Sequence, residues 1–115
     1  MVMTPTQSEP LLLVDSDEPG RSSMIDLLRN ERYAVTALGS GTLALEYLAL
    51  GTMPCLIMFV LRDGDDSVSF RRAQQDNKTW SAVPTVLFTA EAGPVSAAVT
   101  HTMLTLVGRH CVPVH

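Results

Sequence analysis

The sequence has little of several residue types that mark particular classes of protein. It has two cysteines, Cys55 and Cys111, which are too few for a disulfide scaffold and favour a reducing, cytosolic setting. Its longest apolar run, residues 53–61, is interrupted by Pro54 and is far shorter than the roughly 20 residues of a membrane helix. No basic and then apolar leader opens the chain, so we expect no export signal and a cytoplasmic location.

Charged residues are also scarce, at 17%, and the net charge is −4 at pH 7. Binding to nucleic acid requires a clustered basic surface, which this balance does not offer. Hydrophobic residues make up 46%, which is enough for a core and argues against disorder. The 115 residues correspond to one domain. We expect it over residues 11–115, after a polar N-terminal extension at 1–10.

Five short apolar runs, most of them followed by turn-forming residues, predict strands that are buried in a sheet. These strands are expected at 11–14, 33–38, 55–61, 85–89 and 109–114. Apolar residues at helical spacing predict a helix in each interval, near 19–32, 43–48, 68–74 and 94–107. Alternation of strands and helices implies parallel strands, right-handed crossovers and helices on both faces of the sheet. The predicted fold class is therefore α/β.

The last two helices carry further expectations about side chains. The third is expected to bury Val68, Phe70 and Ala73 and to expose Gln74. Gly108 is expected to end the fourth helix before the last strand begins. On this placement Cys55 opens the third strand and Cys111 lies near the end of the fifth, so a disulfide between them is not expected.

In open parallel sheets, ligands and chemistry collect at the carboxyl ends of the strands. Asp15, Ser16 and Asp17 follow the first predicted strand. Val60 and an acidic loop containing Asp63 stand at the end of the third. Thr89 ends the fourth strand and Val112 stands in the fifth, and these positions form the candidate site.

At these positions the chain resembles the receiver domain of two-component response regulators. The segments that carry the resemblance are LLLVDSDEPGR, YAVTALGSGTLALEYL, PCLIMFVLRDGDDSVSF, VPTVLFTA and CVPV. The resemblance implies a flavodoxin-like, doubly wound sheet of five parallel strands in the order 2-1-3-4-5. It also implies a role in phosphorelay signalling, in which receivers are phosphorylated on an aspartate with the help of Mg²⁺.

Position by position, the resemblance indicates a degenerate receiver. The first Mg²⁺-binding acid matches Asp15 and the hydroxyl after strand four matches Thr89, while the second acid is replaced by Ser16. The phosphoacceptor falls on Val60, which has no oxygen to attack phosphorus, and the strand-five lysine falls on Val112. Loss of the aspartate and the lysine together avoids leaving either charge buried without its partner. We therefore expect no aspartyl phosphorylation, no enzymatic activity and no required cofactor.

Other interpretations stay open. Asp15 and Asp17 could retain a weak cation site, helped by Asp63 or Asp65, although a capped and solvated turn explains them more simply. Asp63 or Asp65 could act as a displaced phosphoacceptor in a working receiver. A small nucleotide- or flavin-binding protein is a third reading, but the acidic turn after the first strand lacks a glycine-rich phosphate cradle. The three histidines do not have the spacing of metal ligands.

The chain ends directly after the last predicted strand, where receivers place a final helix. Without that helix, Val86, Phe88 and Cys111 would leave an exposed apolar strip, which usually marks an interaction surface. We expect a partner protein, a second copy of the chain or a rearranged fourth segment to cover it. The leading hypothesis is a signalling module that binds a protein partner or dimerises through its strand-four and strand-five face.

Overall fold

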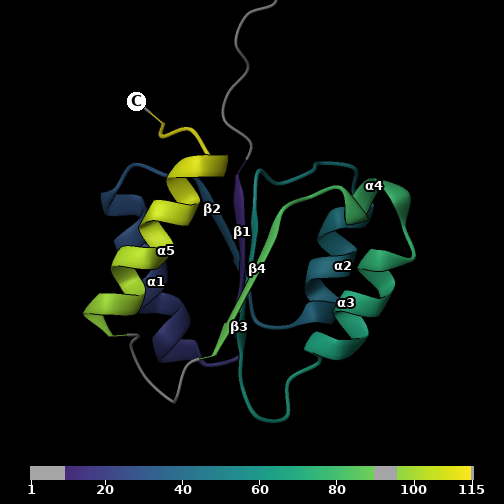
Figure 1. The fold of residues 1–115 in the computed structure, drawn as a ribbon. Helices are drawn as coiled ribbons and strands as arrows, with labels where there is room; N and C mark the ends of the chain where they lie inside the picture. Colours follow the sequence, from purple (N-terminus) through teal and green to yellow (C-terminus); the bar gives the residue numbers. More distant parts are fainter. Residues whose placement is uncertain (1–9, 90–95, 115) are drawn as a thin grey trace, which may run out of the picture.

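The computed structural model describes residues 10–89 and 96–114. These residues form four strands and five helices, which Figure 1 shows as a layered α/β arrangement. The elements in chain order are β1 (Leu11–Val14), α1 (Glu18–Asn30), β2 (Val35–Leu38), α2 (Gly41–Ala49), β3 (Ile57–Leu61), α3 (Ser67–Gln75), α4 (Lys78–Ser81), β4 (Thr85–Thr89) and α5 (Ala97–His110). Most of the expected N-terminal extension and the expected start of the fourth helix lie outside the described residues.

The four strands form one parallel sheet in the order β2-β1-β3-β4. Leu12 lies beside Thr36 on one side and Ile57 on the other, which places β1 at the centre. All side chains of β1 and the first four of β3 are buried, as their unbroken apolar runs predict. The expected parallel α/β sheet is therefore confirmed for its first four strands, in the expected order.

Alternation along the strands divides the core into two layers. On one face, Leu11, Leu13 and Met58 pack with residues of α1 and α5. On the other face, Leu12 and Phe59 pack with residues of α2 and α3. Figure 1 shows this division, with α1 and α5 together on one side of the sheet and α2, α3 and α4 on the other.

The prediction of which α3 side chains are buried was partly wrong. Phe70 is buried as expected, but Val68 is 70% exposed and Gln74 is buried. The amide of Gln74 donates to the Trp80 carbonyl oxygen at 3.1 Å and to the Thr85 hydroxyl at 2.8 Å. These partners come from α4 and β4, so a polar residue takes the inward position because the neighbouring elements satisfy it.

The expected fifth strand is absent from the described residues. Instead of ending at Gly108, α5 continues to His110, and residues 111–114 follow it without strand pairing. Packing of Met103 and Val107 against the core explains why the glycine does not end the helix, since tertiary contacts outweigh its low helix propensity. Because α5 lies on the α1 face, it partly covers the strip that includes Val86 and Phe88, which remain half-buried. Of the three expected covers, the rearranged fourth segment is present, and it leaves part of the strip open.

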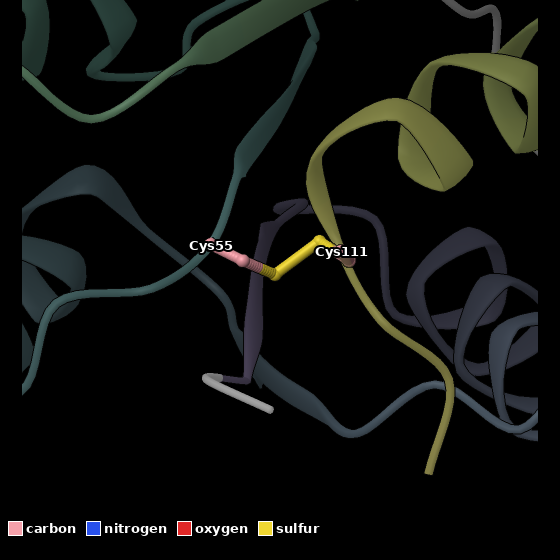
Figure 2. Close-up of a disulfide and its surroundings, with 2 residues drawn as sticks. All are labelled: Cys55 and Cys111. Atoms are coloured by element: carbon pink, nitrogen blue, oxygen red, sulfur yellow. A yellow bond between two sulfur atoms is a disulfide. The ribbon is translucent and has the colours of Figure 1, made fainter. Parts of the chain in front are cut away.

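A disulfide joins Cys55 and Cys111, contrary to the sequence expectation. Their Cα atoms are 5.5 Å apart, within the range that a disulfide requires. Figure 2 shows Cys55 on the segment that enters β3 and Cys111 on the segment that leaves α5. The expectation failed because it assigned Cys111 to the end of a strand, whereas α5 runs back along the sheet and delivers Cys111 to the amino end of β3. Because disulfides persist mainly in oxidising compartments, the paired cysteines also withdraw the support that the low cysteine count gave to a reducing compartment.

No helix among the described residues is both long and apolar enough to span a membrane.

Candidate functional site

The carboxyl ends of the strands place most of the sequence-predicted positions at one edge of the sheet. Asp15 follows β1 directly, Val60 is the penultimate residue of β3, and Thr89 ends β4. Strand pairing sets Val60 beside Phe88 and Leu61 beside Thr89. The loops after β1 and β3 therefore meet at this edge, where the candidate site lies.

Asp15 is the charged centre of the site. It is 1% exposed, and its carboxylate accepts two hydrogen bonds from one guanidinium group, that of Arg62. Nε donates to Oδ1 at 2.9 Å and Nη2 donates to Oδ2 at 2.9 Å. Such a bidentate pair is the strongest geometry that arginine and a carboxylate form. The hydrogen bonds to Asp15 raise the pKa of Arg62 above its already high usual value, so the guanidinium stays charged.

The turn into α1 completes the surroundings of the guanidinium. Asp17 lies 3.7 Å from Nη2 of Arg62 through its Oδ2 atom, and the same oxygen accepts from the Gly20 amide at 2.9 Å. A Cβ atom on Gly20 would lie 2.5 Å from Nη2 of Arg62 and 2.9 Å from Asp17 Oδ2. Residue 20 must therefore lack a Cβ atom for the guanidinium to keep its place beside the two carboxylates. Asp17 also caps α1, as the simpler reading of this turn predicts.

This arrangement does not fit a receiver-type Mg²⁺ site. Asp15 and Asp17 do come together, but the guanidinium of Arg62 lies against both carboxylates. An Mg²⁺ ion demands near-octahedral oxygen ligands, and a fixed cation beside the same oxygens opposes its binding. Among the described residues, no cluster of three or more His, Cys, Asp or Glu side chains could hold a metal ion. The charge that a metal would supply is supplied by a side chain.

Val60 is the residue that the resemblance to receivers matched to the phosphoacceptor position. It is 1% exposed and belongs to the core layer under α1 and α5, together with Leu13 and Met58. A buried isopropyl group can neither attack phosphorus nor bind a cation. The structure thus brings Val60 to the expected place and gives it a packing role.

The acidic loop after β3 is held by its own aspartates. Asp65 accepts from the Arg62 amide at 2.7 Å and from the Ser67 hydroxyl at 2.6 Å, which closes the loop onto the start of α3. Burial on its own raises the pKa of Asp65, but these hydrogen bonds outweigh it and hold the pKa below its usual range. Both carboxylate oxygens of this proposed substitute phosphoacceptor are therefore engaged, whereas Asp63 is exposed.

Asp66 links this loop to α2. Its carboxylate accepts from the amides of Gly41 and Thr42 at 2.7 and 2.8 Å, at the positive end of that helix. Burial raises the pKa of Asp66, but the hydrogen bonds from Gly41 and Thr42 more than offset this and lower it. Asp66 thereby fixes the β3–α3 loop against α2 and has a structural role.

The remaining predicted positions are not joined to the Asp15–Arg62 pair. Ser16 and Thr89 are exposed. Val112 is 65% exposed and follows α5, one residue after the disulfide that ties this segment to the start of β3. It therefore lies at the amino ends of the strands, and its match to the strand-five lysine position was wrong because the described residues contain no fifth strand.

Sequence reasoning missed Arg62, the residue that organises the site. A signal was present: Arg62 is a cation that directly follows the buried apolar strand β3. The carboxyl ends of neighbouring parallel strands meet at one edge, so Asp15 after β1 and Arg62 after β3 were bound to be close. A buried carboxylate needs such a partner.

Comparison with solved structures agrees with the fold. A response regulator from Desulfuromonas acetoxidans superposes with a TM-score of 0.66 at 18% identity, covering 88% of this chain and 97% of that one. The N-terminal domain of a response regulator/sensory box/GGDEF 3-domain protein from Carboxydothermus hydrogenoformans gives a TM-score of 0.63 at 18% identity, covering 88% and 94%. A fusion carrying residues 181–211 of the trimeric coiled coil of yeast Spc42 gives 0.62 at 24% identity. The match covers 84% of this chain and 60% of the fusion.

No family model and no curated protein matches the sequence. At 18% identity, the structural likeness to response regulators shows the fold and leaves the chemistry to the residues of this chain. Those residues place an arginine–aspartate pair and a buried valine at the positions that the resemblance matched to the metal site and the phosphoacceptor of receivers. The chain thus has the α/β fold of response regulator receiver domains.

Proposed function

We propose that this chain is a receiver-like signalling module that is not phosphorylated on aspartate and acts through contacts with other proteins. The observation that carries the proposal is the combination of a buried Val60 with the bidentate Arg62–Asp15 pair. The first removes the nucleophile of the phosphorylation reaction, and the second replaces the metal with a permanent internal cation. A receiver-like fold without this chemistry keeps its surfaces, so its signal depends on what those surfaces bind.

The state of the acidic pair supports regulation by assembly and not by a metal-dependent reaction. Because the Arg62 guanidinium is covalently part of the chain, the charge on Asp15 is balanced at all physiological Mg²⁺ concentrations. The same acidic turn disfavours a nucleotide or flavin, whose phosphate groups would face the carboxylates of Asp15 and Asp17. We propose no cofactor and no catalytic activity for this site.

The working surface that we propose is the side of the molecule at β4, through which the module contacts a partner protein or a second copy. We also propose a cytoplasmic location, where two-component signalling modules operate. Since the Cys55–Cys111 disulfide does not support a reducing compartment, this location rests on the signalling role alone. Fractionation of the source cells would test it, and recovery of the protein only outside the cytoplasmic fraction would contradict it.

The central test is phosphorylation by a small acyl phosphate donor. The protein is incubated with acetyl phosphate and Mg²⁺ and its intact mass is measured, with an active receiver domain as the positive control. We expect no adduct on the wild-type chain under conditions that phosphorylate the control. A stoichiometric, acid-labile phosphoryl adduct would overturn the proposal. Variants Asp63→Asn and Asp65→Asn would then show whether a displaced aspartate carries it.

A further inference from the structure

The free edge of β4 is the starting point for a more specific inference. In the described part of the chain, β4 pairs only with β3, and its outer edge has no strand beside it. Figure 1 shows β4 at the front of the sheet, with α5 on one side and α2 and α3 on the other, and none of these helices lies across it. All five side chains of β4 are at least partly exposed, whereas four of the five in β3 are buried.

The register shows which backbone groups the free edge presents. The Ile57 amide donates to the carbonyl oxygen of Pro84 at 2.9 Å, and Ile57 lies beside Thr85 in the ladder. Because alternate residues of a strand point to the same neighbour, the N–H and C=O groups of Leu87 point away from β3. An exposed edge of this kind is a template for another strand.

A hollow lies on each side of this edge. Toward α5, a cavity of about 330 Å³ is lined almost entirely by apolar side chains, among them Val86, Phe88 and Val99. Toward α3, a groove of about 430 Å³ has Leu61, Val68 and Leu87 in its lining together with two arginines. Leu87 is 42% exposed in this second groove. These are called the α5-side cavity and the α3-side groove below.

One kind of occupant fills both hollows. Successive side chains of a β-strand point to opposite faces of the sheet. A strand that pairs with β4 would direct every second side chain into the α5-side cavity and the others into the α3-side groove. A helix or a globular surface could fill one hollow but would leave the edge groups of Leu87 unpaired.

Charge decides which strand fits. Arg71 and Arg72 line the α3-side groove, none of the described residues that line it is acidic, and the chain as a whole has a net charge of −4. Two copies of this chain paired antiparallel through β4 would bring both arginine pairs to the same face of the joined sheet, which is unfavourable. A strand with carboxylates on this face would instead form charge-assisted contacts with the arginines.

We infer that β4 accepts an extended segment of another protein by strand addition, with apolar side chains entering the α5-side cavity and acidic side chains facing Arg71 and Arg72. The inference rests on the proposed function, because it names the partner chemistry of the proposed β4 surface. The backbone pairing supplies general affinity, and the alternation of apolar and acidic residues supplies specificity.

The test uses synthetic peptides that alternate leucine or valine with glutamate, and matched peptides with lysine in place of glutamate. Binding is measured by titration calorimetry, and amide signals of the β4 residues are followed by NMR. We expect binding of the glutamate series only, with protection of the Leu87 amide. Arg72→Glu should weaken binding by roughly tenfold or more, because it reverses one contact charge. The same change at Arg29, an exposed residue of α1, should leave the affinity unchanged.

A second variant tests the edge itself. Leu87→Pro removes the outward N–H without removing a bond to β3, so the variant should fold but bind no peptide. Absence of binding by every glutamate peptide, or equal binding of the lysine series, would overturn the inference. Light scattering that shows a dimer broken by Leu87→Pro would also overturn it in favour of a second copy. Because phosphorylation is measured separately, failure of peptide binding leaves the test of the proposed function intact.

Discussion

Replacement of Arg62 by methionine gives the sharpest test of the internal cation. The side chain of Arg62 is 9% exposed and that of Asp15 is 2% exposed, so the change leaves a buried carboxylate without its counter-charge. Breaking a buried pair in this way costs roughly 3–5 kcal/mol. Asp15 retains a hydrogen bond from the Asp17 amide at 2.9 Å, so we expect about 3 kcal/mol. Methionine keeps most of the buried chain length, which limits any contribution from lost packing.

The second arm of this test uses a compensating change and a metal. Asp15→Asn in the Arg62→Met background removes the unpaired charge and should restore most of the lost stability. Mg²⁺ should stabilise the single Arg62→Met variant, by about 1.4 kcal/mol at ten times its dissociation constant, because the guanidinium of Arg62 no longer lies against Asp15 and Asp17. It should have no such effect on the wild-type chain.

The assay is equilibrium unfolding in urea, with and without Mg²⁺, followed by circular dichroism. Arg21→Met serves as the matched control, since Arg21 donates to the backbone oxygen of Asp15 at 2.8 Å and not to its carboxylate. A loss below about 1 kcal/mol for Arg62→Met, equal to that of this control, would refute the assignment of Arg62 as the internal cation. So would a double variant that is no more stable than the single one.

Three further predictions concern the disulfide, the packing around the guanidinium and the acidic loop. Replacing Cys55 and Cys111 by serine should lower the free energy of unfolding by about 4 kcal/mol, because the disulfide spans 56 residues. Equilibrium unfolding in urea measures this loss of stability. An unchanged urea midpoint after reduction of the wild-type disulfide would contradict the prediction. Gly20→Ala should displace Arg62 and lower the free energy of unfolding by roughly 2 kcal/mol in the same assay. In the Arg62→Met background the same change should have little further effect. Full additivity of the two changes would show that the two residues are not coupled. Since the folded-state pKa of Asp66 is lowered, its contribution to stability is complete above its unfolded pKa of about 4 and is lost as the pH falls through the folded value. Asp66→Asn should therefore reduce the pH dependence of the free energy of unfolding below about pH 4. The same pH dependence in the variant as in the wild type would count against the role of this loop.

Local sequence signals were sufficient for the sheet. The unbroken apolar run at 11–14 matches β1 and the one at 55–61 contains β3, because strands buried in a parallel sheet contain few polar residues. Where the assignment failed, a distant partner decided the outcome. Helical spacing around Phe70 was recognised, but periodicity alone does not say which flank of the stripe is buried. Hydrogen bonds from outside α3 placed Gln74 inward and left Val68 exposed.

The sequence predicted where the candidate site lies, but it did not predict all of the residues that form it. Asp15 and Val60 lie where the resemblance to receivers placed them, because both depend on the ends of well-defined strands. Val112 does not, because its assignment required a fifth strand that the described residues lack. Arg62 and the Cys55–Cys111 bond depend on how separate segments meet in space, and the path of α5 across the sheet was the missing information.

The Cys55–Cys111 bond has a mechanical consequence. It closes a covalent ring that contains β3, α3, α4, β4 and α5, while β1, α1, β2 and α2 lie outside it. A pulling force applied to the two ends of the chain passes through the disulfide bond. The residues between Cys55 and Cys111 therefore cannot be extended while the bond is intact. Reduction would release about 190 Å of additional extension, at roughly 3.4 Å for each of the 56 residues that the bond spans. Under load, the oxidised chain can therefore extend only through the residues outside the ring, whereas the reduced chain can extend over its full length.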